Sequence, residues 1–314
     1  MKKIIFLIIR ALISAALIII LVYMMRGKYH AIVGAVKGTK IAIFILALFT
    51  FICAGALASL RLKIIVNIQN IKIRFREALS LNFIGYFFNN FLPTSIGGDV
   101  VKAYYLSRKK KEKMPAFTAI FIDRVIGLIT MIFMAFIALL IAGNQISDVK
   151  VRYAIYLVTL MALGAIIFMT NRRIAKKFSI MLVFARPIED KLKTAYNVIH
   201  RHKHHTMLMC QSFAISIASQ LMFFLTIGIL AVSIGSRIPA LDLLLRMPIV
   251  STISLLPSIN GLGVREGATV VFFGPIIGRE NAFVVSILLL AVLLVTSLVG
   301  GAIYALSPQF KMKH

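Results

Sequence analysis

Six long apolar stretches constrain this chain more than any other feature of its sequence. A membrane-spanning helix needs about 20 mostly apolar residues, and the stretches of that length are 4–25, 41–60, 114–142, 152–170, 206–234 and 282–306. Hydrophobic residues make up 60% of the chain and charged residues 15%, against about 45–50% and 25% in soluble domains. The sequence therefore predicts an all-α polytopic membrane protein and excludes a soluble enzyme, a disulfide scaffold and a disordered chain.

Two further apolar regions, residues 79–107 and 241–278, are interrupted by residues that break helices. The predicted breaks are Pro93, Gly97 and Gly98 in the first region and Pro257, Gly261 and Gly263 in the second. Interrupted backbone at membrane depth is tolerated only where it is buried in protein or lines a wet cavity. We therefore predict two re-entrant hairpins beside six full spans, which a plain hydropathy count would report as eight spans.

The distribution of basic residues orients these elements. The net charge is +26, and most Lys and Arg residues fall in gaps between apolar runs, including residues 61–76, which we assign to a cytoplasmic loop. The positive-inside rule is satisfied only if both hairpins return to the side from which they enter. We therefore expect both termini inside the cell and no nucleic-acid partner.

A single transmembrane domain, residues 1–314, is expected to contain two half-repeats, residues 1–143 and 150–306. Each half has three spans and one hairpin before its last span, so the halves would have opposite orientations. Such inverted repeats are common in transporters, whose binding sites form at mid-membrane from broken helices. Within the second half, residues 171–205 predict a basic amphipathic segment on the cytoplasmic surface.

Polar residues at membrane depth are the candidates for function. A rise of 1.5 Å per residue gives Asp99 and Asp123 similar depths, so both are expected to meet Arg124. The candidate substrate-binding residues are Asn89, Asn90, Asp99, Lys102, Asp123 and Arg124 in the first half and Asn260, Arg265 and Glu266 in the second. Structural roles are alternatives: a helix N-cap for Asp99, intramembrane salt bridges for the charged pairs, and an Arg246 side chain that reaches the outer surface.

Three segments resemble motifs of the lysylphosphatidylglycerol synthase transmembrane-domain family, also called flippase-like. They are NNFLPTSIGGDVVKA at residues 89–103, FIDRVIG at 121–127 and LPSINGLGVREG at 256–267. The family includes the N-terminal half of the multiple peptide resistance factor, which translocates aminoacylated phospholipid. This chain ends at His314 without an aminoacyltransferase domain, so the resemblance implies translocation and not lipid synthesis.

The sequence thus favours a flippase for a membrane lipid or lipid-linked substrate, multi-pass in the inner cell membrane. Lys102, Arg124 and Arg265 would attract a phosphate head group. We expect no enzyme activity, no metal and no cofactor. Two alternatives remain: an enzyme or accessory of polyprenyl-phosphate-sugar or glycolipid metabolism, and a secondary transporter of a small anion. The Gly300-Gly301 pair predicts close helix packing, within the chain or in a homo-oligomer.

Overall fold

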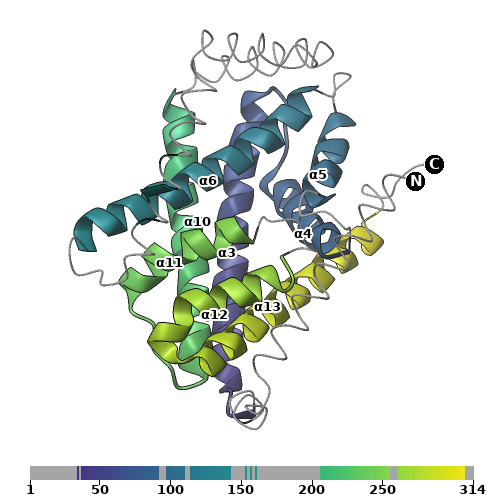
Figure 1. Cartoon of the computed structure of the whole chain (residues 1–314). Helices are drawn as coiled ribbons and strands as arrows, with labels where there is room; N and C mark the ends of the chain where they lie inside the picture. Colours follow the sequence, from purple (N-terminus) through teal and green to yellow (C-terminus); the bar gives the residue numbers. More distant parts are fainter. Residues whose placement is uncertain are drawn as a thin grey trace, which may run out of the picture.

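The computed structural model describes residues 37–91, 97–109, 114–142, 206–254 and 261–307, together with the isolated positions 34, 153, 156, 157 and 160. Within these ranges the chain forms eight helices and no strand (Figure 1). The predicted all-α fold is therefore confirmed. The expected spans 4–25 and 152–170 and the basic segment 171–205 lie outside the described residues.

Four helices are long and apolar enough to cross a membrane: α3 (Ile41–Ile68), α6 (Met114–Ala142), α10 (Thr206–Ser233) and α13 (Arg279–Leu306). They match four of the six predicted spans. A 28-residue helix such as α3 is about 42 Å long, which exceeds the ~30 Å hydrocarbon core. Because α3 continues to Ile68, the assignment of Arg61 to a cytoplasmic loop is wrong; Arg61 lies within this helix and is buried.

The two interrupted regions are pairs of short helices. The first hairpin consists of α4 (Phe75–Phe91) and α5 (Gly97–Ser107), and the second of α11 (Ala240–Ile253) and α12 (Val264–Ile277). These helices have 17, 11, 14 and 14 residues, or about 16–26 Å each, so none crosses the hydrocarbon core alone.

The helix breaks fall where Pro and Gly predict them, between residues 91 and 97 and between 253 and 264. Gly97 and Gly98 open α5, whereas Gly261 and Gly263 have φ of 78° and 80°. This left-handed backbone favours glycine because a Cβ atom would clash there. Pro93, Pro257 and Asn260 lie outside the described residues.

Polar contacts tie together the two arms of each hairpin. At the base of the first, Glu77 accepts hydrogen bonds from Lys109 Nζ at 2.7 Å and from the Arg74 backbone N–H at 3.0 Å. Burial raises the pKa of Glu77, but these donors outweigh it and hold the pKa below its usual value.

In the second hairpin, Arg246 of α11 donates to Asp242 at 2.9 Å and to the Phe272 carbonyl of α12 at 2.7 Å. Arg246 is only 8% exposed. The expectation that its side chain reaches the outer surface is therefore wrong, because the partly exposed Asp242 carboxylate and the Phe272 carbonyl hold the guanidinium in a buried position.

Helices α3 and α10 pack side by side in opposite directions through the middle of the molecule (Figure 1). The contacts that fix this orientation are Lys40 N–H to the Ser233 carbonyl at 3.0 Å, Thr50 Oγ1 to Thr226 Oγ1 at 3.0 Å, Ser219 Oγ to the Ala54 carbonyl at 2.9 Å and Arg61 Nη1 to Ser216 Oγ at 2.7 Å. Residue numbers rise along α3 as they fall along α10, so the two helices are antiparallel.

The remaining helices pack around this pair in a repeating pattern. The first hairpin contacts α13 through α4 and α6 through α5, whereas the second contacts α6 through α11 and α13 through α12. Exchanging α3 with α10, α4 with α11, α5 with α12 and α6 with α13 converts each of these contacts into another. An inverted repeat of residues 1–143 and 150–306 would produce this pattern, and the division into halves stays a prediction.

Two glycines let α13 cross α4 at close range. A Cβ atom on Gly300 would overlap the carbonyl group of Phe83, and one on Gly301 would lie 2.7 Å from the ring of Phe87. The close packing predicted for this glycine pair is therefore found within the chain, against the first hairpin.

We expect Gly300→Val to lower the free energy of unfolding of the detergent-purified protein by about 1–3 kcal/mol or more, because α13 must move away from the Phe83 carbonyl. Ala302→Val is the matched control, since Ala302 lies on the same helix and is exposed. Fluorescence-monitored thermal unfolding would measure both variants. Equal unfolding midpoints for the two would contradict the close approach.

Candidate functional site

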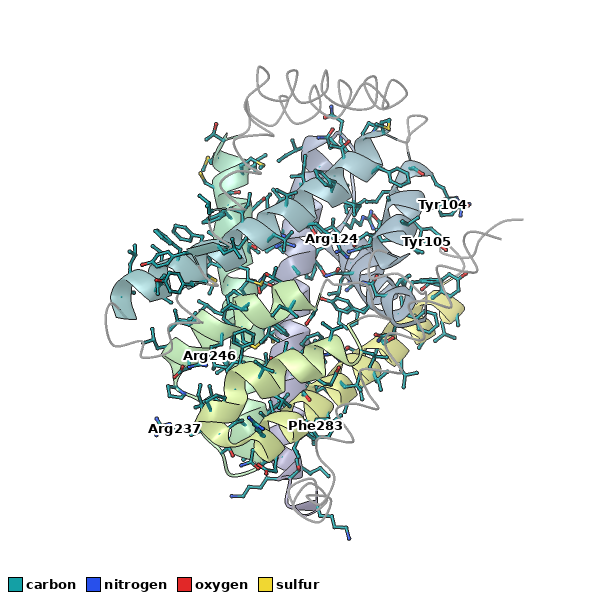
Figure 2. All side chains as sticks on the ribbon, in the orientation of Figure 1. Tyr104, Tyr105, Arg124, Arg237, Arg246 and Phe283 are labelled. Atoms are coloured by element: carbon teal, nitrogen blue, oxygen red, sulfur yellow. The ribbon has the colours of Figure 1, made fainter. Side chains whose placement is uncertain are left out.

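Asp99, Lys102 and Arg124 form a group of charges between the first hairpin and α6, here named the Asp99 cluster. Lys102 Nζ lies 2.8 Å from Asp99 Oδ1, and Arg124 Nε donates to Asp99 Oδ2. Asp99 and Lys102 are buried, whereas 34% of the Arg124 side chain is exposed. Arg124 projects from α6 toward the centre of the molecule (Figure 2). Asp99 and Arg124 therefore meet, as their predicted depths require.

Two asparagines at the end of α4 hold the hairpin in place. Asn89 Oδ1 accepts the backbone N–H of Gly98 at 2.8 Å and so caps the start of α5. Asn90 Nδ2 lies 3.5 Å from the Leu293 carbonyl of α13. In this structure Asn89 makes the cap that the sequence allowed for Asp99, whose carboxylate is occupied by two cations.

The hairpin brings its arms close enough for Lys102 to reach across α4. A Cβ atom on Gly98 would overlap the carbonyl of Gly85, and a Cβ on Gly85 would lie 3.1 Å from Lys102 Cε. The Lys102 ammonium reaches Asn82 Oδ1 at 3.4 Å. The two glycines thus leave room for the lysine stem between the arms.

Asp123 does not join the Asp99 cluster, and the expectation that it would is wrong. It forms a bidentate ion pair with Arg61 of α3, from Nε to Oδ1 at 2.8 Å and from Nη2 to Oδ2 at 3.1 Å. Adjacent helical residues project about 100° apart, so Asp123 faces α3 while Arg124 faces the hairpin. We name Arg61 and Asp123 the Arg61 pair.

The Arg61 pair is buried where three helices meet. Arg61 is 8% exposed and Asp123 is 7% exposed. Arg61 Nη1 donates to Ser216 of α10 at 2.7 Å, and a Cβ atom on Gly127 would lie 3.2 Å from the same nitrogen. Because Gly127 has no side chain, the guanidinium can lie directly against α6.

Asn82 of α4 makes polar contacts with both α3 and α5. Asn82 Nδ2 donates to Ser59 Oγ at 3.1 Å, and its Oδ1 lies near Lys102. The Asp99 cluster and the Arg61 pair meet on α6, at the adjacent residues Arg124 and Asp123.

The second hairpin has a smaller site where α12 begins. Arg265 Nη2 donates to Glu266 Oε1 at 2.7 Å, and Glu266 Oε2 accepts the Gly263 backbone N–H at 2.6 Å. Arg265 is 9% exposed and Glu266 is 4% exposed. Arg265 Nε is buried without a hydrogen-bond partner among the described residues. It is therefore a donor that a bound acceptor group can satisfy.

The buried carboxylates differ in how many basic side chains approach them. Asp123 pairs with Arg61, Asp242 with Arg246 and Glu266 with Arg265. Asp99 lies between two basic side chains, Lys102 and Arg124. Of these four carboxylates in the described part of the chain, Asp99 is the one that two cations share.

These features define an integral membrane protein of broken helical hairpins with ion pairs buried between its helices. The chain belongs to the family described as the lysylphosphatidylglycerol synthase TM region, whose model matches residues 7–301. It is also 32% identical over 155 residues to a protein of Methanocaldococcus jannaschii described as a UPF0104 membrane protein. That match covers 46% of this chain and 44% of the relative, so the chain spans less than half the length of this relative.

We expect Asp99→Asn to destabilise the protein by about 3–5 kcal/mol, because Lys102 and Arg124 would lose the carboxylate between them. Glu77→Gln is the matched control: Glu77 also pairs with a lysine, at 2.7 Å, but with both side chains partly exposed. Its loss should cost at most about 1 kcal/mol. Thermal unfolding of both variants in one detergent measures the difference, and equal losses would contradict the structural role of the Asp99 cluster.

Proposed function

We propose that the protein is a flippase for a membrane lipid or lipid-linked molecule that carries a phosphate group, rather than an enzyme. The observation that carries this proposal is the Asp99 cluster, in which two basic side chains, Lys102 and Arg124, share one carboxylate. Charge at membrane depth is costly and marks substrate pathways. The guanidinium of Arg124, whose side chain is 34% exposed, favours a substrate with an anionic head group.

The broken hairpins support a path for that head group. Arg265 offers its unsatisfied Nε and lies in the first turn of α12, whose N-terminal end carries partial positive charge. The head group would leave one of the two arginines, Arg124 or Arg265, and contact the other, while the acyl chains remain in the surrounding lipid. Family membership agrees with this proposal.

The same proposal specifies the cellular location of the protein and its partners. The protein would be multi-pass in the inner cell membrane, with lipids as its partners and no nucleic acid. The sequence contains no Walker A motif. The lipid would therefore move down its gradient or with a coupled ion, using no metal and no cofactor.

Reconstitution tests the proposal directly. Purified protein would be placed in vesicles that contain a trace of phosphatidylglycerol labelled on an acyl chain with a dithionite-reducible fluorophore. External dithionite should bleach about half of the label in protein-free vesicles. We expect it to bleach nearly all of the label with wild-type protein, because translocation carries the inner leaflet outward.

Arg124→Gln and Arg265→Ala should slow the bleaching of the label that starts in the inner leaflet, since each variant removes a donor for the phosphate. Lys109→Gln is the control, because it removes a positive charge from the hairpin base outside the site. Wild-type protein that bleaches no more than protein-free vesicles would refute the flippase. Uptake of a soluble anion, or nucleotide release from a sugar donor, would then favour the alternatives of an anion transporter or a polyprenyl-phosphate-sugar enzyme.

A further inference from the structure

The ion pair of Arg265 with Glu266 differs from the Arg61 pair in how the carboxylate meets the guanidinium. In the Arg61 pair, both oxygens of Asp123 accept, one from Nε and one from Nη2. In the second hairpin, Glu266 Oε1 accepts from Arg265 Nη2 at 2.7 Å. Arg265 Nε, the donor that would complete the same bidentate contact, is buried without a partner among the described residues. One ion pair is therefore saturated, whereas the other leaves a donor available.

The start of α12 explains why the second contact is not made. Glu266 Oε2 accepts the backbone N–H of Gly263 at 2.6 Å, as the acidic member of a capping box. Gly263 has a φ of 80°, a backbone conformation that favours glycine. Because the backbone holds this oxygen of Glu266, the oxygen is not bonded to Arg265 Nε. The local backbone thus fixes Glu266 and keeps Nε available to a ligand.

An acceptor that binds Arg265 Nε lies beside the Glu266 carboxylate, because Nε and Nη2 are bonded to the same carbon atom. Glu266 is only 4% exposed, and its hydrogen bond to Gly263 keeps it in that position. The sequence of the helix break, residues 254–264, adds no other charged side chain. A bound anion is therefore attracted by Arg265 and repelled by Glu266.

The charge of the anion decides which effect prevails. The cost of removing an anion from water rises with the square of its charge. The attraction to Arg265, which Glu266 offsets in part, rises only in proportion to the charge. An anion with one negative charge is therefore favoured at this site over an anion with two.

We propose that Glu266 is the specificity-determining residue of this site, and that it restricts Arg265 to phosphodiester head groups with one negative charge. Phosphomonoesters, which carry about 1.5 to 2 negative charges at neutral pH, would be excluded. The inference deepens the proposed function, on which it rests in assigning Arg265 to the phosphate of the substrate. It gives the Glu266 carboxylate a role beyond capping α12.

The test compares two lipids that differ in the charge of the phosphate group. The protein is reconstituted in vesicles with equal amounts of phosphatidylglycerol, a phosphodiester, and phosphatidic acid, a phosphomonoester, with identical acyl chains. The vesicles are kept at about pH 8.5, above the second pKa of ~6 of a phosphomonoester. Native mass spectrometry of the gently extracted protein measures the ratio of the two retained lipids. For wild type we expect enrichment of phosphatidylglycerol over the vesicle composition.

Glu266→Gln should lower the ratio of phosphatidylglycerol to phosphatidic acid by roughly tenfold, because loss of the repulsion favours the anion of higher charge more. The glutamine side chain can still accept the Gly263 N–H. Asp242→Asn is the matched control: Asp242 also pairs with an arginine of the second hairpin, Arg246 at 2.9 Å, but lies in the first turn of α11. This variant should keep the wild-type ratio.

The double variant Arg265→Met/Glu266→Gln separates specificity from a general change in the fold. Replacing both members of a buried ion pair is often well tolerated, so this variant remains informative where Glu266→Gln folds poorly. It should retain the two lipids in the proportion of the vesicles, because the donor and the repelling charge are both absent.

Equal ratios in wild type and Glu266→Gln, or an equal shift in Asp242→Asn, would overturn the inference. A double variant that keeps the wild-type preference, or that retains as much phosphatidic acid as Glu266→Gln, would overturn it as well. Translocation is measured separately in the dithionite assay. Retention selective for phosphatidylglycerol without translocation would refute the flippase and leave the role of Glu266 intact, whereas translocation with unselective retention would do the reverse.

Discussion

The burial of charge between membrane helices is the constraint on which the rest of this structure depends. Each buried carboxylate must have a cation within hydrogen-bonding distance, because neither lipid nor apolar side chains can solvate it. The bidentate contact of Arg61 with Asp123 joins α3 to α6, and the contact with Ser216 adds α10. Asp99 then joins the first hairpin to α6 through Arg124. The ion pairs thus determine which helices meet and which faces they present.

Small residues make these ion pairs sterically feasible. Lys102 passes over Gly85, the Arg61 guanidinium lies over Gly127, and α13 crosses α4 at Gly300. A larger side chain at any of these positions would separate helices whose polar groups must touch. Glycine lowers helix stability, but in a lipid environment it allows the close approach on which van der Waals packing depends. The ion pairs therefore depend on the glycines, which allow the helices to approach closely.

The sequence predicted the elements better than it predicted their partners. Long apolar runs and Pro-Gly breaks were sufficient to place four spans and two hairpins, because both signals are local. The depths of Asp99 and Arg124 along their helices predict that these two residues meet. Depth does not predict the partner of Asp123, because it does not specify which way a side chain faces.

Arg61 is the residue for which charge alone gives the wrong prediction. The basic region that begins at Arg61 predicts a loop, yet Leu62, Ile65 and Val66 continue the apolar face of α3 and are buried. That continuing pattern was the available signal. Positive charge alone did not distinguish a cytoplasmic loop from a buried guanidinium whose partner lies 62 residues away in the chain.

The two hairpins make similar contacts with α6 and α13 but differ in their charged groups, and this difference bears on the proposed function. The first half carries the Asp99 cluster and the Arg61 pair, whereas the break of the second hairpin holds Arg265 and Glu266, which neutralise each other. A head group that moved between two equally charged sites would gain nothing at either. Under the proposed function, a phosphate head group would meet two cations beside Asp99 and an unsatisfied donor at Arg265, so its contacts would be mainly electrostatic at the first site and would depend on hydrogen bonding at the second. The weaker second site would favour release, so the asymmetry in charge would set the order of contacts on a path that the packing pattern makes nearly symmetrical.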